Sequence, residues 1–274
     1  MKKIIILLIV IPFIFQSCFK WDNWDEPDCT IYGTFFDTYT GEPLLVSQNE
    51  WQIHMWERSF NGLVGGASVR QDLRIKQDGT YQNTKFFAGM YDMIIDRGPF
   101  WYIDTLRIEV GKKTEQNFQV TPFYQIIDLK TEVGLSEFGP ATNRETHPSL
   151  TVKFKVRAPL KEKNGETLPN VDYVRAFLSL TEFCGNGSDG NLGTYDNDNV
   201  EQGTAGRLRV NRSWEDEMIA RFPDIDPNSN TTGEYIIGPL HVKSGYTYNV
   251  RAGANRTGNG GRWNYSEIVK VSIP

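Results

Sequence analysis

The alternation of apolar and polar residues constrains the fold of this chain more than any other feature. Short runs in which every second residue is apolar occur at 106–110, 152–156 and 246–254. A period of two places successive side chains on opposite faces of a β-strand. The chain also holds 25 glycines and 13 prolines, a density that favours many turns over long helices. The sequence therefore predicts an all-β protein of two β-sandwich domains in tandem, over residues 28–121 and 122–274.

One short helix is expected within the second sandwich. Trp214, Met218 and Phe222 are spaced four residues apart, so they lie on one face of a helix. Ser213, with an acidic residue three positions later, is typical of a helix start, and Pro223 ends the helix. We expect this helix to pack on an edge of the sandwich or on the neighbouring domain.

Residues 1–17 are typical of a secretion signal. Lys2 and Lys3 precede a run of 12 apolar residues, which is shorter than the ~20 that a membrane-spanning helix needs. The sequence Phe-Gln-Ser-Cys, ending at Cys18, resembles the lipoprotein box of Bacteroidetes bacteria. This resemblance implies cleavage before Cys18, lipidation of Cys18 and a stable anchor in the outer-membrane lipid. The alternative is an ordinary cleaved signal that a cysteine happens to follow.

The segment after the cleavage point predicts an extended tether. Residues 18–27 are polar and acidic, include two tryptophans and show no apolar period. An acidic stretch in this position also resembles the surface-export signal of Bacteroidetes lipoproteins. The resemblance implies that the protein is displayed on the outer membrane and faces the cell exterior.

Three motifs in the first domain resemble those of a known sandwich family. They are Gly-x-x-x-Asp-x-x-Thr-Gly-Glu-Pro-Leu over 33–44, Asp-Gly-Thr-Tyr at 78–81 and Ala-Gly-Met-Tyr at 88–91. This pattern resembles the carboxypeptidase-regulatory-like domain, a transthyretin-type β-sandwich, and implies architecture more than activity. The segment 48–69 departs from that family because it is longer and more aromatic than usual.

The second domain resembles a fibronectin type III or immunoglobulin-like sandwich near its C-terminus. Leu240 is followed six residues later by Tyr246, a spacing similar to the tyrosine corner of those folds. The usual Pro-Gly between the two residues is replaced by Val242 and Lys243. Taken whole, the chain resembles a family of Bacteroidetes surface lipoproteins of unknown function. Members of that family accompany polysaccharide-utilisation systems, which implies a glycan and an outer-membrane transporter complex as partners.

The sequence offers little material for catalysis or for metal binding. It holds three histidines and three cysteines, and it lacks the Gly-x-Ser-x-Gly and His-Glu-x-x-His motifs of hydrolases. Residues 185–190 match Gly-x-Gly-x-x-Gly, but no helix follows that could face a dinucleotide. The Asp- and Asn-rich residues 186–199 either bind calcium or form surface turns. A net charge of −5 argues against a nucleic-acid partner. We therefore expect no enzyme, no cofactor and no metal site.

Aromatic residues are the best candidates for function. Sugars present apolar faces and hydroxyl edges, so their sites pair a flat ring with amide or charged groups. Arg262, Trp263, Asn264 and Tyr265 have this composition in a glycine-rich loop, and Trp101 is a second candidate. The alternative is that these tryptophans fill a core or the contact between the domains.

The leading hypothesis is a non-catalytic surface lipoprotein that binds or presents glycan for an outer-membrane uptake system. The alternative function is a structural or assembly accessory that docks on a transporter protein, with Trp51 and Trp56 in the docking surface. The sequence also leaves open whether Cys29 and Cys184 form a disulfide or remain two buried thiols.

Overall fold

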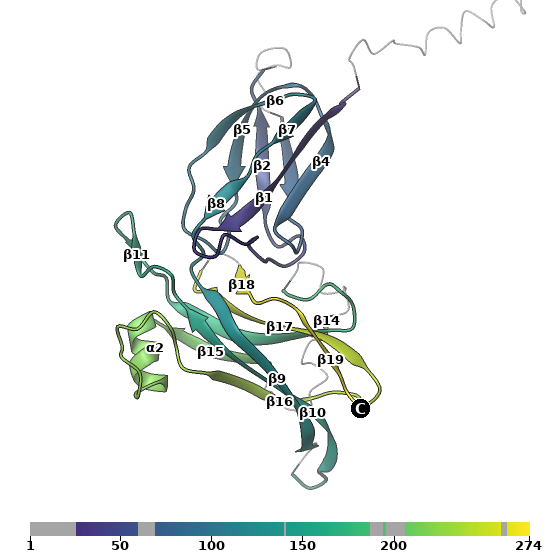
Figure 1. Ribbon diagram of the computed structural model, residues 1–274, viewed down its shortest axis with the longest axis vertical. Coiled ribbons are helices and arrows are strands. Elements are labelled where there is room, and N and C mark those ends of the chain that lie inside the picture. The colour runs from purple at the N-terminus through teal and green to yellow at the C-terminus, as the bar shows by residue number, and fades with distance from the viewer. Residues whose placement is uncertain (1–25, 60–68, 140, 187–193, 196–205, 259–261) are drawn as a thin grey trace, which may run out of the picture.

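Two β-rich domains stacked end to end make up the protein (Figure 1). The computed structural model describes residues 26–59, 69–139, 141–186, 194–195, 206–258 and 262–274. Within these residues the all-β prediction with one short helix is confirmed. No helix in the described part of the chain is long and apolar enough to cross a membrane. Cys18 and the rest of the expected signal and tether up to residue 25 lie outside the described residues, so their roles stay predictions.

The first domain consists of two sheets. In one sheet β1 pairs antiparallel with β4 and parallel with β7 and β8; the other sheet is antiparallel in the order β3-β2-β5-β6. Every second residue of β1 is buried, as its alternating sequence dictates. The strands are β1 (Cys29–Asp37), β2 (Gln52–Glu57), β3 (Arg70–Arg74), β4 (Thr80–Phe86), β5 (Gly89–Ile95), β6 (Leu106–Val110), β7 (Lys113–Glu115) and β8 (Phe118–Val120).

Aromatic rings fill the core of the first domain. The Phe35 ring stacks on Phe118 at 4.7 Å between centroids, and its edge meets the ring of Trp51 at 4.8 Å. Trp51 is 2% exposed, which contradicts the prediction that it forms part of a docking surface. The Trp51 ring packs in the core because its burial removes a large apolar area from water. Trp56, on the opposite face of β2, is half-buried with the Arg70 guanidinium 5.8 Å from its ring centroid.

The second domain also consists of two main sheets. One has the order β16-β10-β9; the other has the order β14-β13-β17-β18, with β15 also on β13 and β19 also on β17, and β11 and β12 form a separate hairpin. The strands are β9 (Gln125–Phe138), β10 (Glu145–Arg157), β11 (Glu162–Lys163), β12 (Glu166–Thr167), β13 (Val171–Ser179), β14 (Thr194–Tyr195), β15 (Arg207–Arg212), β16 (Tyr235–His241), β17 (Thr247–Arg256), β18 (Trp263–Tyr265) and β19 (Val269–Ser272). The predicted alternation in 152–156 is confirmed, because Val152, Phe154 and Val156 are all buried.

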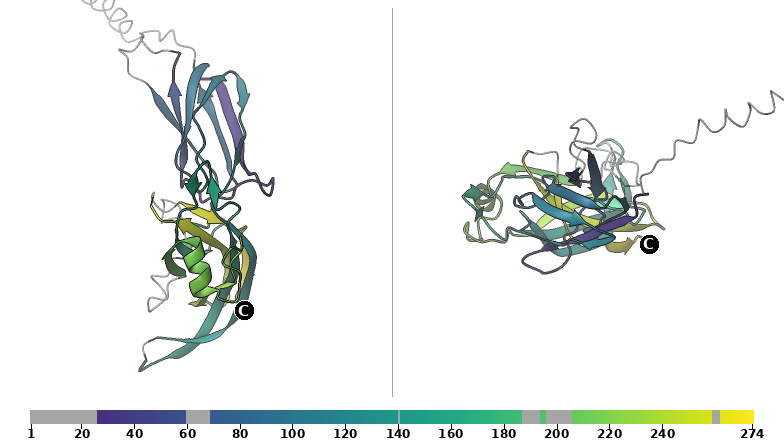
Figure 2. Two further views of the ribbon diagram at one scale, coloured as in Figure 1. Left: turned by 90° about the vertical axis from the view of Figure 1, so that its left-hand side faces the viewer. Right: turned by 90° about the horizontal axis from the view of Figure 1, so that it is seen from above.

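The expected helix forms as α2 (Trp214–Arg221) and lies against the side of the second domain (Figure 2). Ser213 caps it, since the Ser213 Oγ accepts a hydrogen bond from the Asp216 amide at 3.2 Å. The Trp214 ring is buried parallel to Tyr124, with 6.4 Å between centroids. The helix therefore packs on its own sandwich beside β15, one of the two positions that the sequence allowed.

The tyrosine expected at the corner of the second domain is two residues later in the chain. Tyr246 is 46% exposed, whereas Tyr248 is buried and its hydroxyl accepts a hydrogen bond from the Lys243 amide at 3.1 Å. The prediction for Tyr246 is wrong because the turn extends through Gly245, at φ 80°, and β17 starts only at Thr247. The first inward-facing tyrosine of β17 is therefore Tyr248.

The two cysteines within the described residues do not pair. Cys29 lies in the core of the first domain and Cys184 lies at the contact between the domains, and both are buried free thiols. Of the two alternatives that the sequence left open, the structure has the buried thiols.

Glu217 provides a test of the packing of α2. Its carboxylate is 1% exposed and accepts hydrogen bonds from Arg212 at 3.1 Å, from the Tyr235 hydroxyl at 3.1 Å and from Arg221. We predict that Glu217→Ala lowers the free energy of unfolding by about 2–4 kcal/mol, because it leaves the buried Tyr235 hydroxyl and two guanidinium groups without their acceptor.

The measurement is urea unfolding followed by circular dichroism. Glu215→Ala is the matched control, since Glu215 is an exposed residue of the same helical turn and its removal should cost less than about 1 kcal/mol. Equal losses in the two variants would contradict a structural role for the buried carboxylate.

Candidate functional site: the interdomain cleft

Arg251 of β17 joins the two domains from within their contact. Its guanidinium is buried and donates hydrogen bonds to the Val46 carbonyl of the first domain at 2.9 Å and to the Cys184 carbonyl of the second domain at 2.9 Å. Two further bonds reach the Ser266 carbonyl, and the Tyr265 ring centroid lies 4.1 Å from the guanidinium carbon. Carbonyl dipoles and a ring face thus surround the buried cation.

Glu50 of the first domain lies in the same contact and binds the second domain through its carboxyl group. One carboxyl oxygen accepts from the Trp263 amide at 2.9 Å, and the other accepts from the Ser47 amide at 3.3 Å. Tyr265 also hydrogen-bonds to this carboxyl group. Complete burial outweighs these donors and raises the pKa of Glu50 to about 8.

Further polar contacts extend the junction to both sides. Arg262 donates to the Asp96 carboxylate at 2.7 Å, and the Gln77 side chain bonds to the Glu182 carbonyl and the Cys184 amide, each at 2.9 Å. These bonds cross from one domain to the other with directional geometry, so they favour one relative orientation of the domains.

The rings that the sequence offered for stacking on sugars are part of this junction. Trp263 is 4% exposed and meets Phe177 edge to face at 5.1 Å, and Tyr265 is 7% exposed. Trp101 of the first domain is 2% exposed and packs with Phe123 in the core of the second domain. The expected exposed platform at Trp263, Tyr265 and Trp101 is therefore not formed, because the domain contact buries these rings, as the alternative prediction held. The Arg262 side chain forms an ion pair with Asp96.

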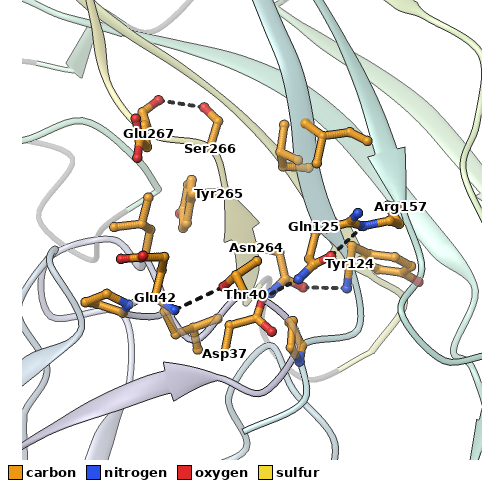
Figure 3. Close-up of a pocket in the computed structure, with 16 residues that line it drawn as sticks. Asp37, Thr40, Glu42, Tyr124, Gln125, Arg157, Asn264, Tyr265, Ser266 and Glu267 are labelled. Atoms are coloured by element: carbon orange, nitrogen blue, oxygen red, sulfur yellow. Dashed lines mark hydrogen bonds between the residues drawn. The ribbon is translucent and has the colours of Figure 1, made fainter.

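A cleft of about 200 Å³ with a mixed polar and apolar lining, here called the interdomain cleft, opens beside the junction (Figure 3). The first domain lines it with the turn that follows β1, including Thr40 and Glu42. The second domain lines it with the start of β9, Arg157 and residues 264–267. Two of the predicted site residues, Asn264 and Tyr265, thus line the same cleft, whereas Arg262, Trp263 and Trp101 do not.

A chain of hydrogen bonds fixes the polar wall of the cleft. Arg157 donates to the Gln125 side-chain oxygen at 2.7 Å, and the Gln125 side-chain nitrogen donates to the Asp37 carboxylate (Figure 3). Asp37 also accepts from the Tyr39 amide at 2.8 Å. Each member is held by its neighbour, so the wall is organised before any ligand arrives.

Asn264 belongs to the wall of this cleft and carries an unpaired side-chain donor. Its side chain is 3% exposed, and its Oδ1 accepts a hydrogen bond from the Tyr124 amide at 3.1 Å (Figure 3). Its Nδ2 has no hydrogen-bond partner among the described residues. A buried donor without an acceptor costs about 1–3 kcal/mol of stability.

Gln125 and Arg157 were not predicted as site residues, and Asp37 was named only as part of the motif over 33–44. Gln125 carried a usable signal, since it is a lone polar residue within the apolar run 122–127. Such a residue is either exposed or hydrogen-bonded. Arg157 gave no comparable signal, because its pairing depends on how the domains meet.

The described residues contain no cluster of histidine, cysteine or acidic side chains that could hold a metal ion. Most of the loop 186–199 proposed for calcium lies outside the described residues, as do residues 187–190 of the Gly-x-Gly-x-x-Gly match. What the sequence indicates about calcium and dinucleotide binding at these residues therefore stays a prediction.

The first domain is similar to a known family. Residues 29–121 match the family described as "Protein of unknown function (DUF3823) N-terminal domain". No curated protein gives a significant match to the chain.

Solved structures resemble the chain over both domains. A DUF3823 family protein from Bacteroides uniformis has a TM-score of 0.55 at 22% identity, with 90% of this chain and all of that chain covered. A DUF3823 family protein from Parabacteroides merdae has a TM-score of 0.53 at 17% identity and the same coverage. A third structure from Bacteroides uniformis, described as a "putative carbohydrate binding protein", has a TM-score of 0.58 at 18% identity, also with 90% and 100% covered. At these identities the likeness shows the shared two-domain fold.

The raised pKa of Glu50 makes the stability of the junction depend on pH. The carboxyl has a pKa of about 8 in the folded chain and an ordinary value of 4.5. At a pH between these two values, the folded state therefore keeps a proton that the unfolded state has lost. Its contribution is fully present below pH 4.5 and is lost as the pH rises through about 8. We predict that the wild-type protein loses stability between pH 5 and 8.5 and that Glu50→Gln loses markedly less.

The measurement is the free energy of unfolding by urea at pH 5, 6.5 and 8.5. Glu42→Gln is the matched control, because Glu42 is an exposed glutamate and this variant should keep the wild-type pH dependence. If Glu50→Gln and the wild type show parallel pH profiles, the Glu50 carboxyl does not carry the proton assigned to it.

Proposed function

We propose that this protein binds a neutral glycan in the interdomain cleft and does not cleave it. The observation that carries the proposal is Asn264, a residue of the cleft wall whose buried Nδ2 has no hydrogen-bond partner among the described residues. The likeness in fold to the structure described as a "putative carbohydrate binding protein" adds support at the level of the fold.

The groups that line the cleft suit hydroxyl ligands. Asp37, Glu42 and Glu267 provide carboxylate acceptors, while Arg157 and Asn264 provide donors. A sugar hydroxyl both donates and accepts, so it can bridge the two kinds of group. Three carboxylates against one guanidinium give the lining an excess of negative charge. Uronic or sulfated glycans would be repelled, and we therefore propose a neutral sugar.

The cellular role follows from the N-terminal sequence features. We propose that lipidated Cys18 anchors the protein in the outer membrane facing outward. The two domains then hold glycan for a polysaccharide-uptake system. The accessory function, in which the partner is a transporter protein and no glycan binds, is the outcome that the binding test must exclude.

Asn264→Asp is the sharpest test of the cleft. Aspartate keeps the oxygen that accepts from the Tyr124 amide and replaces the unpaired donor with an acceptor. We predict that this variant weakens binding about 10-fold, since one hydrogen bond to a sugar contributes about 1 kcal/mol and the new charge adds to the loss. The measurement is isothermal titration of the purified full-length chain with maltohexaose, cellohexaose, mannohexaose and xylohexaose.

Asn255→Asp is the matched control. Asn255 is 5% exposed and its Oδ1 also accepts from a backbone amide, that of Tyr173 at 2.8 Å, but it does not line the cleft. This variant should lose stability because it buries an acid, but it should keep the wild-type affinity for the sugar. Full affinity in Asn264→Asp would remove the cleft from the proposal. A wild-type chain that is folded and binds none of the four sugars would favour the accessory function.

A further inference from the structure

A second cleft lies along the same domain junction. It has a volume of about 220 Å³ and is lined by the segment 95–103 of the first domain together with Phe123 and Glu166 of the second; it is called here the Tyr102 cleft. The extended segment 122–124 separates the two clefts, because Pro122 and Tyr124 line the interdomain cleft while Phe123 lines the Tyr102 cleft.

Tyr102 gives this cleft a feature that the interdomain cleft lacks. Its side chain is 66% exposed, whereas Tyr124 and Tyr265 in the interdomain cleft are 1% and 7% exposed. An exposed ring of this size in a cleft is an apolar surface available for contact. The face of a pyranose carries C–H groups that can cover such a ring.

The two residues that precede Tyr102 in the chain fix its backbone. Phe100 is buried in the core of the first domain, 5.2 Å from the Trp51 ring, and Trp101 is buried in the core of the second. The Trp101 amide also donates to the Thr121 carbonyl at 2.9 Å. With consecutive residues fixed in two separate cores, little backbone freedom is left to lose when Tyr102 is covered by a ligand.

The ring has polar groups within the same cleft. Glu166 contributes a carboxylate, and Arg97 is an exposed cation near it. Asp96 contributes a second carboxylate, which already accepts from Arg262 and from the Arg97 amide. Phe100, Ile103 and Phe123 contribute apolar surface. A flat exposed ring beside charged acceptors and a donor is the combination expected of a sugar site.

We infer that the Tyr102 cleft is a second glycan-contacting site, in which a neutral pyranose stacks on the Tyr102 ring and its hydroxyls bond to the charged rim. This inference rests on the proposed function, because it names a second place where the same class of ligand is held. The sequence offered the aromatic segment 98–102, with Trp101 as its candidate residue; of the three rings in this segment the structure exposes Tyr102.

The test compares three variants of the full-length chain by isothermal titration with maltohexaose, cellohexaose, mannohexaose and xylohexaose. Tyr102→Ala should weaken binding about 5- to 10-fold, the effect of losing an aromatic stacking contact. Tyr102→Phe keeps the ring and should stay within about twofold of the wild type. Tyr246→Ala removes a tyrosine that is 46% exposed and lines neither cleft, and it should leave the affinity unchanged.

The outcomes separate the two claims. Loss of affinity in Tyr102→Ala, with Tyr102→Phe retained, supports the second site. Wild-type affinity in Tyr102→Ala, while Asn264→Asp loses binding, overturns the second site and leaves the interdomain cleft. The reverse pattern overturns the interdomain cleft as the primary site. Failure of the wild-type chain to bind any of the four sugars overturns both.

Discussion

The arrangement of the two domains depends on the burial of the Arg251 guanidinium between them. Removing a charged group from water is costly unless it is hydrogen-bonded, and here backbone carbonyls from both domains accept four hydrogen bonds from Arg251. Burial lowers the pKa of Arg251, but the ordinary value is so far above neutrality that the group remains charged. Separating the domains would remove the Val46 carbonyl from Arg251 and expose the guanidinium to water.

The clefts are consequences of that junction. The interdomain cleft takes one wall from each domain, so its shape exists only while the domains keep their orientation. The same holds for the Tyr102 cleft, where Glu166 of the second domain faces residues of the first. A small rigid contact thus turns two sandwiches, each with a filled core, into a body with polar concave surfaces.

Local sequence patterns predicted the fold well because their causes are local. Alternation in 152–156 reports a strand with one buried face, and Ser213 with Trp214 reports a capped amphipathic helix; neither needs knowledge of the other domain. Tyr246 and Tyr248 show the limit, since both lie on the same face by alternation. Only the extent of the preceding turn decides which of them faces inward.

The site was harder to predict because it is made by residues distant in the chain. Trp263 has the composition of a sugar platform, but Phe177 and the first domain cover its ring. When a tryptophan is buried by residues 80 or more positions away, the sequence around the tryptophan does not show it. Asn264 was singled out as part of a polar and aromatic loop, and its unpaired nitrogen became visible only with the register of β18.

The most direct test of the central claim is the side-chain amide signal of Asn264 in nuclear magnetic resonance. The signal can be assigned by its loss in Asn264→Asp and followed while ¹⁵N-labelled protein is titrated with each of the four hexasaccharides. The account predicts a saturable shift of the Nδ2 protons as a sugar hydroxyl becomes their acceptor. An Asn264 signal that stays unchanged while a sugar binds, or no binding by the folded chain, would contradict it.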